Sequence, residues 1–267
     1  MKMSKHVGVV AVAVMFTAGM AVAQIQGTIV TPDDRRIEGT LKWKAREKAY
    51  GVVAKGGNVE LEMALANIKE VVVPRPRELD AAIANIQQGN AALAVPVLEK
   101  LSTDYLMLQW DTVATRYLAE AYLKSGEADK ALRVCEKVIS ANPEAAYLGE
   151  MAPAYWQALL KQDRLSKVEE LMAKAIKSGD RSSSAAALVM RGDVILTTGE
   201  TAEVTKKALR DGYLRVVTLY KSERAVLPEA LYKAAKCFEK LGQSSRADQM
   251  RTTLKNEFGS SEWARKP

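Results

Sequence analysis

Residues 112–145, TVATRYLAEAYLKSGEADKALRVCEKVISANPEA, carry the pattern that decides the fold. Apolar residues return every three or four positions on both sides of Gly126, which predicts two amphipathic helices joined by a tight turn. A small residue at Ala119 would let the two helices approach closely, and Tyr122 would fill the space between them. Pro143 would end the second helix. The segment is therefore predicted to form an antiparallel helical hairpin.

The same order of residue types returns in residues 228–261, and less complete copies lie between the two segments. The residues at the aromatic position are spaced 37, 36 and 43 apart: Tyr122, Leu159, Ile195 and Phe238. An earlier unit fits residues 83–101, with Gly89 in its turn. A fixed period of this length is typical of stacked helical hairpins, so we expect five of them. The alternative is an ordinary bundle of amphipathic helices.

The two clearest units resemble the tetratricopeptide repeat. In the first unit the shared positions hold a large apolar residue, a small one, an aromatic, a turn Gly and a small residue in the second helix: Leu118, Ala119, Tyr122, Gly126 and Ala131. The residues in register in the last unit are Ala234, Ala235, Phe238, Gly242 and Ala247, with alanine at the large apolar position. The resemblance implies a mostly α fold, a solenoid of hairpins over residues 76–267. Trp156 occupies a position that prefers Gly or Ala, so packing there should differ.

The C-terminal repeats also resemble those of bacterial outer-membrane assembly lipoproteins and of the TolA-binding periplasmic coordinator. The likeness runs from Pro228 to Ala264 and includes Phe258-Gly-Ser-Ser-Glu-Trp-Ala, where those families have a Tyr-Pro-x-Ser-x-x-Ala phrase. The Pro is missing here. This resemblance implies a scaffold of the bacterial cell envelope, without naming its partner.

In such a solenoid, the first helix of each pair lines a concave groove suited to an extended or helical peptide. The repeat frame predicts that nine side chains face this groove: Arg116, Glu120, Lys124, Gln157, Lys161, Asp193, Tyr232, Lys236 and Lys240. Several are cationic, so we expect an acidic peptide or a terminal carboxylate as partner. Some repeats of this family clamp a carboxylate with Lys, Arg and Asn, but Glu120 replaces the Asn.

Residues 24–75 have a different pattern, in which apolar and polar residues alternate between turn signals. Five short strands are predicted: 25–30, 36–43, 49–54, 58–63 and 68–73. Five short strands suggest a small barrel. So small a unit buries little core alone, so we expect it to lean on the first helices, with Pro74 and Pro76 at the boundary.

The first 23 residues have the form of a secretory signal. Lys2 and Lys5 precede an apolar run that closes with Ala21-Val22-Ala23. An uncleaved membrane anchor is the alternative, but the run is short for a bilayer span of about 20 apolar residues. The first residue after the predicted cleavage site is Gln24, whereas a lipoprotein would have a lipid-accepting Cys there. We therefore expect an exported protein, periplasmic or associated with the envelope, with no membrane span after cleavage.

The chain contains one histidine, His6, and it lies inside this signal. A mature chain without imidazole excludes His-dependent nucleophiles, general bases and metal sites, and no cofactor fingerprint is present. The chain has 39 Lys and Arg residues and 32 Asp and Glu residues. The excess of basic residues is spread along the sequence, whereas nucleic-acid binding requires basic residues concentrated on one surface, so we expect no nucleic-acid partner. The alternative to a binding protein is a carboxylate-dependent enzyme that processes cell wall or glycans, which requires an acid and a base in one pocket.

Two cysteines remain, Cys135 and Cys237. The repeat frame separates them by more than two units, whereas a disulfide requires Cα atoms within about 7 Å. We therefore expect two buried thiols that pack as small apolar groups.

The export signal yields the first test. Cells that make the full chain should contain a mature form that begins at Gln24, and replacing Ala21 and Ala23 with lysine should block its formation. Mass spectrometry of the protein from fractionated cells measures this. A full-length protein retained in the membrane would favour the anchor.

Overall fold

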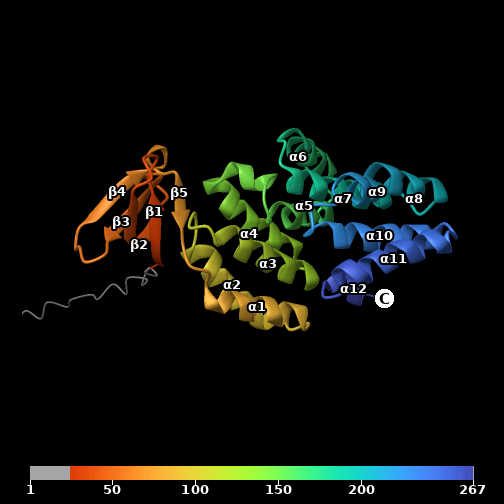
Figure 1. The fold of residues 1–267 in the computed structure, drawn as a ribbon, viewed down its shortest axis with the longest axis horizontal. Coiled ribbons are helices and arrows are strands. Elements are labelled where there is room, and N and C mark those ends of the chain that lie inside the picture. The colour runs from red at the N-terminus through yellow and green to blue at the C-terminus, as the bar shows by residue number, and fades with distance from the viewer. Residues whose placement is uncertain (1–24, 267) are drawn as a thin grey trace, which may run out of the picture.

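The computed structural model describes residues 25–266. It is an elongated array with a sheet at one end and the helices in sequence beyond it (Figure 1). The signal predicted for residues 1–23 lies outside the described residues. Among residues 25–266, no helix combines the length and the apolar run that crossing a bilayer would require.

Five antiparallel strands form the sheet, close to the predicted ranges. They are β1 (Ile25–Val30), β2 (Arg36–Lys44), β3 (Ala49–Ala54), β4 (Glu60–Ala64) and β5 (Glu70–Val72), in the spatial order β4-β3-β2-β1-β5. A closed barrel would require β4 to pair with β5, and the ladders of these strands contain no such pair. The strand count is therefore correct, but the described strands form a sheet with two edges.

One face of the sheet packs against the loop that follows the second helix. Leu108 is fully buried in the core of the sheet, beside Ile29, Leu41 and Val52. Three hydrogen bonds hold the loop. The Tyr50 hydroxyl donates to the Met107 carbonyl (2.6 Å), the Trp110 indole donates to the Val73 carbonyl (2.9 Å), and the Val73 backbone N–H donates to the Gln109 side-chain oxygen (3.2 Å). The sheet thus obtains part of its core from the helical region, as its small size requires.

Five helical pairs follow, as predicted from the period. They are α1 (Arg77–Gln87) with α2 (Ala91–Asp104), α3 (Asp111–Lys124) with α4 (Ala128–Ala141), α5 (Ala152–Lys161) with α6 (Leu165–Lys177), α7 (Arg181–Thr197) with α8 (Ala202–Ala208) and α9 (Leu214–Leu219), and α10 (Leu227–Lys240) with α11 (Ser244–Phe258). A last short helix, α12 (Glu262–Arg265), follows. The turns of the first, second and fifth pairs contain Gly89, Gly126 and Gly242, each with φ between 70° and 86°, where glycine is favoured.

The buried side chains of the helices form two cores. The first joins the first three pairs, and the second joins the last two, with α7 contributing to both. Cys135 lies in the first core and Cys237 in the second, and both are buried free thiols. Burial raises the pKa of Cys135 to about 12 and that of Cys237 to about 11. The predicted role as small apolar groups is confirmed.

The third pair accommodates a tryptophan where the repeat prefers a small residue. Trp156 is fully buried, and its indole donates to the Ala146 carbonyl at 2.8 Å. Ala146 belongs to a 3₁₀ turn, Pro143–Ala146, in the long connection that precedes α5. The longer connection thus supplies both the space and the acceptor that the larger side chain requires.

The fourth pair departs most from the regular pattern. Its second helix is divided by a π-helical turn, Leu209–Tyr213, between α8 and α9. There Gly212 lies so close to Gly192 of α7 that a Cβ added to Gly212 would be 2.7 Å from the Gly192 Cα. Tyr213 covers the other side of Gly192 and is fully buried. Two glycines therefore permit a very close contact between the helices of this pair.

Replacing Gly192 by alanine should destabilise the protein. The new Cβ would lie 2.4 Å from the Tyr213 ring, so a packed side chain must shift, with a cost of about 1–3 kcal/mol in free energy of unfolding. Urea denaturation followed by circular dichroism measures it. Thr252→Ala, at an exposed position of α11, should change the free energy by less than about 0.5 kcal/mol; equal stability of both variants would contradict the close contact.

Candidate peptide-binding groove

The first helices of successive pairs line a concave groove with a volume of about 920 Å³. Its walls come from α3, α5, α7 and α10, and α12 contributes Trp263 at one end. Apolar side chains form much of the lining: Leu123, Leu148, Pro153, Ala154, Leu160, Ala186, Val189, Met190, Val226 and Trp263. A surface of this kind can cover the apolar face of a peptide segment.

Six of the nine predicted residues line this groove. They are Arg116, Glu120, Lys124, Gln157, Lys161 and Asp193, from three successive first helices. The repeat pattern predicts them because it assigns these residues to corresponding positions on successive first helices. That they contact a partner stays a prediction.

The other three predicted residues, Tyr232, Lys236 and Lys240, do not line the groove. Tyr232 is half-buried, and its ring packs against Trp263 of α12, with centroids 5.5 Å apart. Helix α12 thus covers Tyr232, whereas Lys236 and Lys240 are exposed outside the groove lining. In the last unit the lining residues are instead Glu229 and Lys233, one helical turn apart. Repeat counting alone misses them because it does not include the packing of α12.

Lys233 is the centre of a charged cluster in the groove. Its ammonium lies 2.6 Å from a carboxylate oxygen of Asp193 on α7 and 2.6 Å from one of Glu229 on its own helix. The Tyr213 hydroxyl donates to the same Asp193 carboxylate at 2.7 Å. Each of the three charged side chains is only about a fifth exposed, 19% for Lys233 and 21% for the two acids. The cluster therefore joins α7 to α10 through partly desolvated charges.

The pKa values of the cluster have opposing causes. Burial raises the pKa of Glu229 above its usual value, and the nearby Lys233 only partly offsets this. Burial alone would lower the pKa of Lys233, but the Glu229 and Asp193 carboxylates outweigh it and raise that pKa. Lys233 thus stays protonated and holds both carboxylates in ion pairs.

A second group of ion pairs lies on α3. The Arg116 guanidinium donates to Glu120 at 2.8 Å, and it lies 3.2 Å from Glu150. By contrast, neither Lys124 nor Lys161 makes an ion pair among residues 25–266. These two lysines occupy the same position in neighbouring units, at the exposed ends of α3 and α5. The groove therefore offers two lysines whose charges are not already matched.

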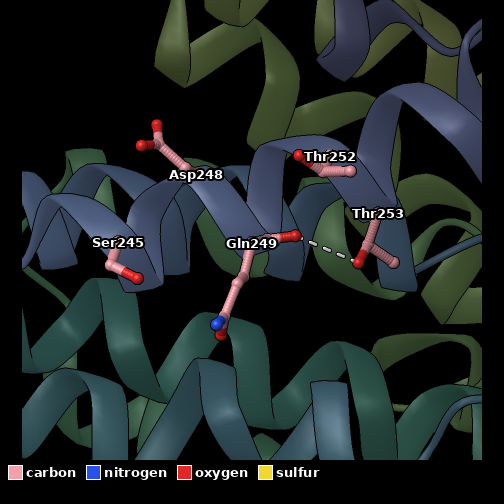
Figure 2. Close-up of a pocket in the computed structure, with 5 residues that line it drawn as sticks. All are labelled: Ser245, Asp248, Gln249, Thr252 and Thr253. Atoms are coloured by element: carbon pink, nitrogen blue, oxygen red, sulfur yellow. Dashed lines mark hydrogen bonds between the residues drawn. The ribbon is translucent and has the colours of Figure 1, made fainter.

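A second hollow, of about 640 Å³, lies on the surface of α11 and is lined by Ser245, Asp248, Gln249, Thr252 and Thr253. Figure 2 shows that all five come from one helix, and the Thr253 hydroxyl donates to the Gln249 carbonyl at 3.1 Å. These side chains belong to the second helix of the last pair, away from the concave groove. They bring no groups together from different elements, so they form a polar helix surface.

The family model of the tetratricopeptide repeat matches residues 116–145 and 229–261. These segments are similar to tetratricopeptide repeats. They coincide with the two units that the sequence marks most clearly, and together they cover less than half of the chain. No curated protein matches.

The solved structures that match this chain have low sequence identity to it. The nearly identical repeats of a putative kinesin light chain from Podosopora anserina are 17% identical, with a TM-score of 0.40, covering 67% of this chain and 92% of that one. MamA AMB-1 is 19% identical, with a TM-score of 0.30, covering 70% of this chain and 100% of that one.

Replacing Lys233 with methionine should destabilise the fold. The change removes the cation that Asp193 and Glu229 share and leaves two partly buried carboxylates facing each other, at a cost of about 2–4 kcal/mol. Urea denaturation measures the loss in the free energy of unfolding. Lys240→Met, an exposed site on the same helix, is the matched control. A loss of similar size in both variants would show that the cluster contributes nothing.

Proposed function

We propose that this protein is a non-enzymatic scaffold that holds a segment of a partner protein in its concave groove. The observation that carries the proposal is the continuity of this groove across four units, with both apolar and charged side chains in its lining. Tetratricopeptide repeats stack into such surfaces, and a peptide laid along one contacts several units at once.

An acidic partner segment is the second part of the proposal. The lining includes five basic and six acidic side chains, so net charge alone favours no sign of partner. Four of the acids, however, are already held by Arg116 or Lys233. Among the basic residues, Lys266 lies over the Trp263 ring, which leaves Lys124 and Lys161 to meet a partner's carboxylates. The charges of such side chains affect the rate at which a partner binds and the register in which it lies more than they affect its total affinity.

We propose that the protein lies in the cell envelope, and the N-terminal signal and the likeness of the last repeats to those of envelope proteins support this. Both are properties of the sequence. A scaffold in the envelope would support the assembly or maintenance of its structures. The carboxylate-dependent enzyme is the less supported alternative, because the carboxylates that face each other across α7 and α10, Asp193 and Glu229, share one lysine ammonium.

A photo-crosslinking amino acid placed at Gln157, in the lining of the groove, should capture the partner in intact cells. The same amino acid at Thr252, on the outer helix α11, is the matched control and should capture nothing comparable. Gel shift and mass spectrometry of the adducts measure the result. Equal adducts at both positions would sink the proposal that the groove holds the partner.

Charge reversal tests the sign of the partner. Lys124→Glu combined with Lys161→Glu should reduce the adduct at position 157 by at least about tenfold, because like charges then meet in the groove. Lys236→Glu combined with Lys240→Glu makes the same change in charge outside the lining and should leave the adduct unchanged. An undiminished adduct in the first variant would show that the partner segment is not acidic.

A further inference from the structure

The outer edge of the sheet has features of a second binding surface, independent of the groove. Strand β4 pairs with β3 on one side only, and on its other side no described strand or loop makes a ladder with it. Figure 1 shows β4 at the edge away from the helices, whereas β5 lies toward them. Its outward backbone groups are therefore available to another strand.

Exposed apolar side chains gather at this edge. The described residues include six large apolar side chains that are strongly exposed, and three of them are Val59 (72%), Leu61 (49%) and Leu65 (47%). The other three lie singly on different helices. Leu61 lies opposite Val52 of β3 and so extends the apolar face of the sheet beyond its covered part. Such clustering on an open edge marks an interaction site.

On the opposite face of the sheet, at the same edge, lysines of β2 form ion pairs with glutamates of β4. Lys42 and Lys44 of β2 reach across β3 to Glu60 of β4, and Lys44 also pairs with Glu62 at 3.2 Å. They can cross because β3 has Gly51 at this point, where an added Cβ would lie 2.8 Å from the Glu60 carboxylate. Across this face the side chains run from basic to small to acidic. Glu60 is already held by both lysines, whereas Glu62 has 51% of its side chain exposed and makes only the longer contact with Lys44. A basic side chain on a strand beyond β4 would therefore meet Glu62.

The geometry points to β4 as a docking edge for an extended segment of a partner protein in which apolar and basic residues alternate. The apolar residues would cover Val59 and Leu61, a basic one would meet the exposed Glu62, and main-chain hydrogen bonds would add the segment to the sheet. A second copy of this chain fits less well. Antiparallel pairing of β4 with itself about its centre would place Glu62 opposite Glu62.

The test uses a fluorescent peptide, acetyl-Lys-Val-Lys-Val-Lys-Val-Lys-amide, and fluorescence anisotropy with the mature protein. Binding should be at least about tenfold weaker for the double variant Val59→Thr, Leu61→Thr, in which threonine keeps the preference for strand but removes the apolar contact. Leu93→Thr, at an exposed leucine of α2, is the matched control and should bind like the unchanged protein.

Three outcomes would overturn the proposal. The first is equal binding by the edge variant and the unchanged protein. The second is equal or tighter binding of the acidic peptide, in which glutamate replaces each lysine. The third is a dimer of the unchanged protein that the edge variant abolishes, because β4 would then be covered by a second copy. Thermal unfolding of each variant confirms that binding is compared between folded proteins. Tighter binding by the Lys124→Glu, Lys161→Glu variant would assign this basic peptide to the groove instead, because both changes make the groove more acidic.

Discussion

The structure depends on one constraint: no helical pair of this chain can bury its own apolar surface. Each pair is a thin layer with apolar residues on both sides, so it is stable only between neighbours. The small residues at the shared positions set how closely the helices approach, and the turn glycines set how tightly each pair closes. The concave groove results from this stacking, because the first helices must lie on the same side when pairs of similar geometry follow one another.

The same constraint explains the ends of the array. At the first end, Leu108 and the loop around it fill the core of the sheet, so the small sheet and the first pairs stabilise each other. At the other end, α12 packs on α10 and covers Tyr232 with Trp263. The sheet and the loop around Leu108 therefore cover one end of the solenoid. Helix α12 covers the other end and also forms part of the groove wall.

Much of this could be predicted from the sequence, and the reasons for the rest are physical. Units with complete patterns, such as the one around Tyr122, were predictable because each residue type has a local cause. The strands were predictable because the alternation of apolar and polar residues indicates which face of each strand is buried. Closure of the sheet was not, because it depends on which edges meet in space. Glu229 and Lys233 were missed because the lining of the last unit depends on where α12 packs, which no local pattern specifies.

The division of the helical region into two apolar cores has a thermodynamic consequence. The buried side chains of α7 belong to both cores, so this helix is the connection through which unfolding of one half is transmitted to the other. The groove is lined by α3 and α5 from the first core and by α10 from the second. An occupant that touches both walls therefore links the two cores. Its binding free energy adds to the free energy needed to unfold one core independently of the other.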